Sequence, residues 1–114
     1  EFDLTNVDTS NVQDMSCMFL GAELFNQEIG GWDTSNVQDM NNMFGEAESF
    51  DQDIGRWDTS NVESMNGMFL NAQSFDQDIS AWCVEQITQK PPLFDSGAGF
   101  EGINAKQPNW GDTC

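Results

Sequence analysis

The chain has 114 residues, with 20 Asp and Glu against 3 Lys and Arg and no His, which gives a formal net charge of −17. This charge repels phosphate, so nucleic acid and anionic membrane surfaces are excluded as partners. No apolar run reaches the roughly 18 residues that a transmembrane segment needs. Because His and Tyr are both absent, we expect a protein that is not an enzyme. Because the sequence starts at Glu1 rather than Met, we expect a processed chain or a piece of a longer one.

The sequence is dominated by a repeat of 25 residues. The pentapeptide Asp-Thr-Ser-Asn-Val occurs at residues 8–12, 33–37 and 58–62. Apolar residues continue the same spacing in columns, which are Met15/Met40/Met65, Met18/Met43/Met68, Phe19/Phe44/Phe69, Ala22/Ala47/Ala72, Phe25/Phe50/Phe75, Ile29/Ile54/Ile79 and Val7/Trp32/Trp57/Trp82. A repeat of this length cannot bury its own apolar face, so stacking must bury it. We expect residues 1–82 to form the repeat domain and residues 83–114 a C-terminal capping segment.

Two local patterns alternate within each repeat. Ser35 stands three residues before Gln38, as in a capping box, and the apolar residues at 37–47 then follow the spacing of one helix face. Residues 52–54 are short enough for a strand of about three residues, and such strands would stack in parallel. The patterns predict an α/β solenoid of leucine-rich-repeat type, with about three to four coils.

The stretch Phe25–Phe44 reads Phe-Asn-Gln-Glu-Ile, two variable residues, Trp-Asp-Thr-Ser-Asn-Val, and then the Met and Met-Phe positions. This stretch resembles the repeat of the BspA-type leucine-rich-repeat surface proteins. The resemblance covers residues 1–82, and the segment 83–114 is similar to the cap that closes such repeats. It implies a right-handed solenoid used for adhesion or protein contact, with no catalytic residues to carry over.

Three cysteines raise the question of disulfide bonds. Cys83 opens the capping segment and Cys114 ends the chain, so a disulfide between them would fasten the cap to the last coil. We expect this disulfide and therefore an oxidising location, either secreted, at the cell surface or in an organelle lumen. The alternative is a cytosolic protein with reduced thiols. Cys17 is placed on the outer face of the first predicted helix, where it either joins another chain or is a tolerated small residue, which we favour.

The acids fall in columns. The first column contains Asp3, Glu28, Asp53 and Asp78, a second contains Asp8, Asp33 and Asp58, and a third contains Glu1, Asp51 and Asp76. On short strands the first column projects from the sheet, beside the inward Ile residues. Together with Asp51 and Asp76 it is the candidate binding column for a partner. The alternatives are a calcium site and a solvated coat that resists aggregation, and we expect no cofactor and no specific metal site. Gln27, Gln52 and Gln77 are expected to point inward and to bond from coil to coil.

These observations favour a non-catalytic module that binds a protein, or attaches at a cell surface, through an acidic face. The alternative is an extrinsic accessory subunit packed on a larger membrane-associated assembly, for example in an organelle lumen. Open columns of like carboxylates supply no cleft with differently tuned acids, which argues against an enzyme.

Overall fold

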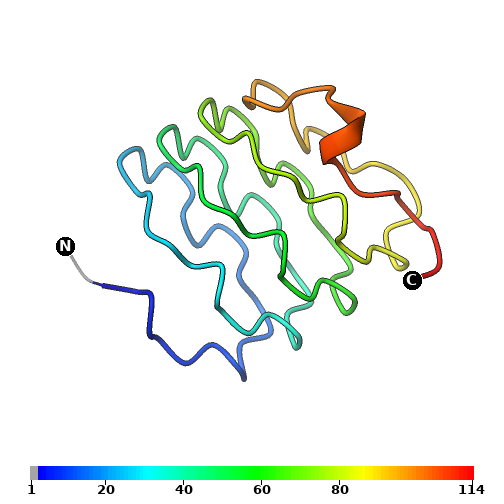
Figure 1. The fold of residues 1–114 in the computed structure, drawn as a ribbon, viewed down its shortest axis with the longest axis horizontal. Coiled ribbons are helices and arrows are strands. Elements are labelled where there is room, and N and C mark those ends of the chain that lie inside the picture. Colours follow the sequence, from blue (N-terminus) through cyan, green and yellow to red (C-terminus); the bar gives the residue numbers. More distant parts are fainter. Residues whose placement is uncertain (1–2) are drawn as a thin grey trace.

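The computed structural model describes residues 3–114, so Glu1 of the third acid column lies outside the described residues. The chain forms successive irregular coils that lie side by side from the N-terminal end to the C-terminal end (Figure 1). We name them coil 1 (residues 7–31), coil 2 (32–56), coil 3 (57–81) and coil 4 (82–100), followed by a closing segment (101–114). Backbone hydrogen bonds join each coil to the next, as from the Met15 amide to the Asp39 carbonyl at 2.9 Å.

The prediction of an α/β leucine-rich-repeat solenoid is wrong. Within residues 3–114 the regular elements are one 3-10 helix, η1 (Asn104–Lys106), and two isolated parallel bridges, Asp14↔Asp39 and Asp39↔Ser64. Neither the helix expected at 37–47 nor the strand expected at 52–54 is present, and there is no sheet among the described residues. None of their helices is long and apolar enough to cross a membrane.

The helix is absent because two residues of each coil adopt left-handed backbone conformations. In coil 2 these are Asn42, with φ of 56°, and Glu46, with φ of 60°. Amides that a helix would use internally turn outward, so the Asn42 amide donates to the Asn66 carbonyl of coil 3 at 2.8 Å. The amides of Met43 and Gly45 close single turns, with the Met43 amide 3.3 Å from the Met40 carbonyl, and the Phe44 amide donates to the Met68 carbonyl of coil 3 at 2.9 Å. Contacts between coils therefore replace the contacts of a helix.

The apparent capping box is a local turn. The Ser35 hydroxyl donates to Asp33 Oδ1 at 2.6 Å, and the Ser35 amide donates to the same oxygen at 2.9 Å. The amide of Gln38 donates to the Gln13 carbonyl of coil 1 at 2.7 Å instead of receiving a serine cap. The motif is thus an Asx-type turn, in which an Asp side chain takes the role of a backbone carbonyl.

Side-chain donors, rather than the backbone amides of a sheet, make several of the hydrogen bonds between coils. The Trp57 indole N–H donates to the Ile29 carbonyl at 3.1 Å, and the Trp82 indole N–H donates to the Ile54 carbonyl at 2.9 Å. The Thr34 hydroxyl likewise donates to the Asp58 carbonyl at 3.0 Å. These bonds satisfy backbone carbonyls that a parallel sheet would otherwise pair.

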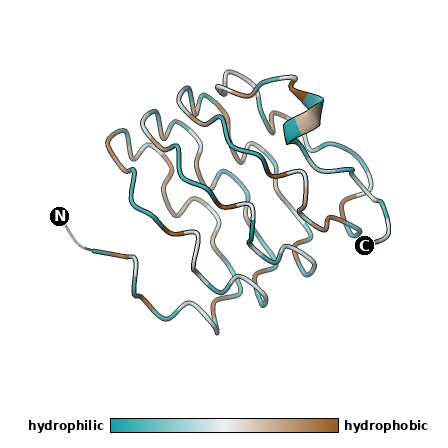
Figure 2. Ribbon diagram, in the orientation of Figure 1, coloured by the Kyte–Doolittle hydropathy of each residue, from teal (hydrophilic) through white to brown (hydrophobic). Residues whose placement is uncertain are grey.

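The apolar columns fill the interior, as their spacing predicted. Met43, Phe44 and Ile54 are fully buried, and hydrophobic residues alternate with hydrophilic ones along each coil (Figure 2). Phe44 stacks on Phe50 within coil 2 with ring centroids 4.1 Å apart, and Trp57 stacks on Trp82 of the next coil at 6.2 Å. Aromatic stacking therefore runs through the core, both within a coil and from one coil to the next.

The C-terminal end is closed covalently. The predicted disulfide between Cys83 and Cys114 is present, with the two Cα atoms 5.7 Å apart. The bonds between coils continue into coil 4, because the Phe69 amide donates to the Phe94 carbonyl at 2.9 Å. Trp110 packs edge-on against Phe94 with ring centroids 4.8 Å apart. The division into a repeat domain at 1–82 and a capping segment at 83–114 stays a prediction.

Candidate functional site

The first acid column lies at the surface, and each of its carboxylates also holds a turn. Asp3, Glu28, Asp53 and Asp78 are all exposed. Each accepts a hydrogen bond from the amide two residues ahead, and each of these bonds is 2.9 Å long. The column therefore has a structural role in addition to any role in binding.

Glycine stands two residues after Glu28 and after Asp53, because the backbones of neighbouring coils come into contact there. A Cβ atom on Gly55 would lie 2.8 Å from the Asp78 carbonyl oxygen, and one on Gly30 would collide with the Asp53 carbonyl oxygen. Real Cβ atoms do not approach backbone oxygens so closely. The spacing of the acid column is thus set by direct contact between the backbones of adjacent coils.

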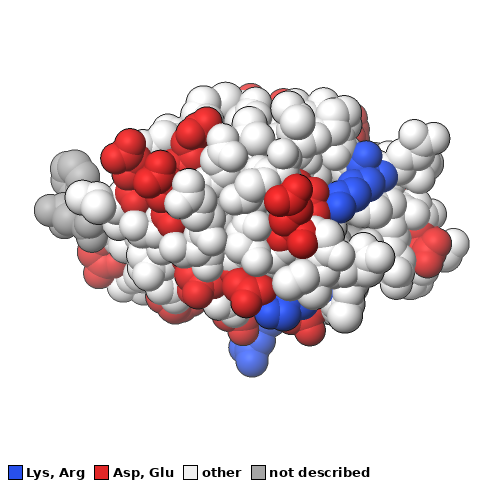
Figure 3. Space-filling view, turned by 90° about the horizontal axis from the view of Figure 1, so that it is seen from above, with Lys and Arg blue, Asp and Glu red and all other residues white. Residues whose placement is uncertain are grey.

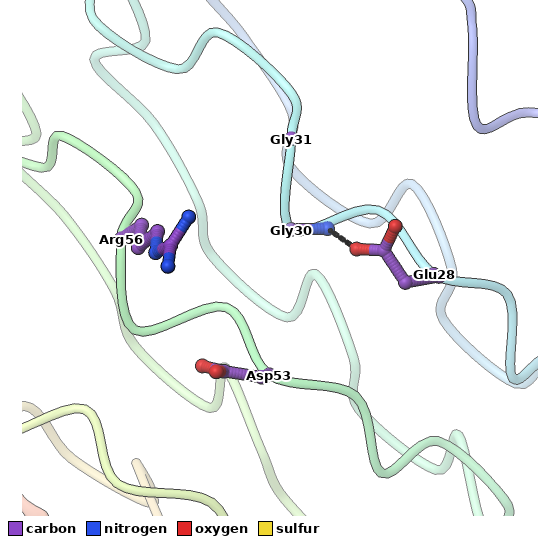
Figure 4. Close-up of a pocket in the computed structure, with 5 residues that line it drawn as sticks. All are labelled: Glu28, Gly30, Gly31, Asp53 and Arg56. Carbon is purple, nitrogen blue, oxygen red and sulfur yellow. Dashed lines mark hydrogen bonds between the residues drawn. The ribbon is translucent and has the colours of Figure 1, made fainter.

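An open hollow of about 310 Å³ lies between Glu28 and Asp53 and is also lined by Gly30, Gly31 and Arg56 (Figure 4). The Glu28 carboxylate bends back to the Gly30 amide, while Asp53 and Arg56 come from coil 2. Within residues 3–114 the ion pairs are Lys90–Asp95 and Lys106–Asp76, so Arg56 pairs with neither acid of the hollow.

Asp51 and Asp76 are occupied by bonds that hold the coils together. Asp51 is half-buried, and its Oδ1 accepts from the Asp76 amide at 3.0 Å and from Gln77 Nε2 at 2.9 Å. Asp76 Oδ1 pairs with Lys106 Nζ at 2.7 Å. Gln77 and Gln52 do bond from coil to coil, but they donate to residues 51 and 26 of the preceding coil rather than to each other.

The second acid column anchors the Asx-type turns. The Ser10 hydroxyl lies 2.6 Å from Asp8 Oδ1, and this bond together with the Ser10 amide lowers the pKa of Asp8 below its ordinary value. Ser35 lowers the pKa of Asp33 in the same way, and the nearby charge of Asp8 opposes this shift weakly. In the first column, Ser80 lowers the pKa of Asp78. These acids are therefore charged near neutral pH.

Among the described residues, the one group of three side chains close enough to share a metal ion is Cys83, Glu85 and Cys114. Its two sulfur atoms are joined to each other in the disulfide, so neither is a free thiolate that could bind a metal. Within residues 3–114, the acid columns do not bring three carboxylates within the same reach.

Cys17 is free and exposed, as predicted, although its place on a helix was wrong. It occupies a left-handed turn with φ of 59°, at the position that Asn42 and Gly67 hold in the next coils. Asn and Gly are the residues that adopt this conformation most readily, so this column carried a signal for a turn.

Coil 1 has an apolar surface at its N-terminal side that was not predicted from the sequence. Val7, Met18, Leu20 and Leu24 are 41% to 86% exposed. The repeat register was the available signal, because Met18 holds the position of the buried Met43 while residues 3–6 are the only described part of a preceding coil.

Comparison with known sequences places this chain in a family. Residues 1–110 match the family described as "Mycoplasma protein of unknown function, DUF285", and the chain belongs to that family. No curated protein and no solved structure shows significant similarity to it.

Proposed function

We propose that this chain is a non-catalytic module that binds a basic protein partner through its exposed acid column. The supporting observation is a large excess of carboxylates over cations. The net charge is −17, while the described residues form two ion pairs, both with lysines near the C-terminal end. On the face shown in Figure 3, several groups of carboxylates lie at the surface with few cations among them.

The regular spacing of the coils favours a partner with several cations. Like charges in one column repel each other, and a basic ligand relieves this repulsion while adding attraction of its own. The turn bonds of Glu28, Asp53 and Asp78 restrict where the carboxylates lie, so little ordering is needed on binding. Such binding weakens as salt screens the charges.

A second candidate is an accessory subunit packed on a larger assembly. The apolar surface at the N-terminal end of coil 1 favours it, because buried apolar area is typical of permanent interfaces. The disulfide is compatible with an oxidising or extracellular location for either function. The resemblance to BspA-type surface proteins remains a prediction and agrees with the first function.

The experiment compares two triple variants of equal charge, using an arginine- and lysine-rich decapeptide as the probe. The column variant carries Glu28→Gln, Asp53→Asn and Asp78→Asn, whose amide oxygens still accept the turn bonds. The control neutralises three other exposed acids, Glu23→Gln, Glu48→Gln and Glu63→Gln. We expect the column variant to bind at least about tenfold more weakly than the control at low salt. Equal losses would show that only bulk charge matters and would refute the column.

A further inference from the structure

The N-terminal side of coil 1 exposes side chains that are buried in the later coils. Met18 is 41% exposed, whereas Met43 and Met68 at the same position are fully buried. Phe25 is half-buried, whereas Phe50 is fully buried. Each later coil is covered on this side by the coil before it. Coil 1 therefore shows one uncovered half of an interface that the molecule makes repeatedly.

The backbone of coil 1 shows the same unfilled interface. In coil 2 the carbonyls of Asp39, Asn41, Met43 and Gly45 accept bonds of 2.8–2.9 Å from amides of coil 1. The equivalent carbonyls of coil 1 belong to Asp14, Ser16, Met18 and Leu20, and no amide of the described residues donates to them. A row of acceptors at alternate residues thus faces outward beside exposed apolar side chains.

Residues 3–6 already follow the path of the last part of a preceding coil. The Leu4 carbonyl accepts from the Trp32 indole N–H at 2.9 Å, as the Ile29 carbonyl accepts from Trp57 at 3.1 Å. The Leu4 amide donates to Gln27 Oε1 at 2.7 Å. The uncovered part of coil 1 is thus the part from Asp14 to Phe25.

We propose that this surface, the N-terminal face formed by Met18, Leu20, Leu24 and the row of carbonyls, is a docking site for one further coil of the same repeat. The occupant presents backbone amides at alternate positions and an aromatic ring over Phe19. Phe44 stacks in the same way on Phe19, with ring centroids 5.5 Å apart.

A second copy of the chain does not fit this surface. Two N-terminal faces brought together would oppose carbonyl to carbonyl and leave both rows without donors. The opposite end of a second copy is covered by the closing segment, which the Cys83–Cys114 disulfide and the packing of Trp110 on Phe94 hold in place. Two copies, each of net charge −17, also repel each other.

The test joins the sequence of residues 33–50 directly to Glu1 of the full chain. This choice keeps the 25-residue register, because Asp51 and Glu1 hold equivalent positions. The matched control carries the same residues in scrambled order. We expect the added coil to raise the melting temperature by roughly 5 °C or more over the scrambled version. In hydrogen exchange, we expect protected amides at alternate positions of the added segment.

Two variants separate docking from a general effect of lengthening the chain. Met18→Asp places a charge in the proposed contact and should abolish the rise in melting temperature. Leu93→Asp changes a residue that is 59% exposed in coil 4, and it should leave the rise intact. Equal melting temperatures for the ordered and scrambled additions would overturn the proposal. So would dimers of the unextended chain that Met18→Asp dissociates, because a second copy would then occupy the face.

Discussion

The contact between coils at the acid column makes Gly30 a sensitive position. Replacing it with Ala puts a methyl group against the Asp53 carbonyl oxygen, which is backbone and cannot rotate away. Coils 1 and 2 would have to move apart locally. This movement would stretch the neighbouring hydrogen bond from the Trp57 indole to the Ile29 carbonyl, which is 3.1 Å long. The change is an overpacking of the interface between coils, which typically costs about 1–3 kcal/mol.

Gly31 provides the matched control at the next residue. A Cβ atom there meets nothing within 4 Å, and its backbone is not left-handed. Gly31→Ala restricts the unfolded chain, so we expect it to be neutral or to stabilise by about 0.4–1 kcal/mol. Any loss seen in Gly30→Ala and not in Gly31→Ala therefore comes from the contact rather than from a general intolerance of alanine.

The assay is thermal unfolding followed by near-ultraviolet circular dichroism, which reports the stacked Trp32, Trp57 and Trp82 rings. A loss of about 1–3 kcal/mol lowers the melting temperature of a chain of this size by several degrees or more. If Gly30→Ala melts at the temperature of the parent or of Gly31→Ala, the close approach of the coils at the acid column is wrong.

Three further predictions test the core, the disulfide that holds the closing segment, and the buried Asp95 of coil 4. Met43→Asp should unfold the domain, because an unpaired charge would replace a fully buried side chain, whereas Met18→Asp, at a residue 41% exposed, should still fold; circular dichroism distinguishes them. Reducing the Cys83–Cys114 disulfide, which spans 31 residues, should cost up to about 4 kcal/mol, and hydrogen exchange should show coil 4 opening first. Burial raises the pKa of Asp95, but its bonds from Lys90, the Gly102 amide and Gln107 outweigh this effect and leave the pKa below its ordinary value. The stabilisation from Asp95 is fully present above 3.8, the ordinary pKa of an aspartate, and should be lost as the pH falls from there through the lowered pKa of Asp95. The melting temperature of Asp95→Asn should therefore fall less than that of the parent on acidification.

The inward columns could be predicted because they depend only on the period. Any arrangement that stacks the repeats in register places Met43 against Met18 and Phe44 against Phe19. This holds for every local backbone conformation of the repeat. The identity of the local elements could not be predicted in this way. A helix at 37–47 and a chain of single turns place the same apolar side chains inward, and the sequence pattern does not separate them.

The difference lies in where the backbone amides find acceptors. The Asn42 amide bonds to coil 3, and this bond exists only once the coils are stacked. Propensities of neighbouring residues therefore carried little information about it. The left-handed column of Cys17, Asn42 and Gly67 was the available local signal, because Asn and Gly at one position of a repeat indicate a turn rather than a helix.

The acid column illustrates how far a structural role can explain a charged residue. The turns at residues 28–30 and 53–55 need an oxygen that accepts the amide of Gly30 or Gly55. Gln and Asn side chains supply such an oxygen as well as Glu and Asp do, and they would avoid repulsion along the column. Asn26 shows that an amide serves in this molecule, since its Oδ1 accepts the Asp51 amide at 2.9 Å, just as Asp51 accepts the Asp76 amide at 3.0 Å one coil later. The turn therefore explains why an acceptor stands at each position of the column but not why it is charged, and that remaining charge is what the proposed basic partner accounts for.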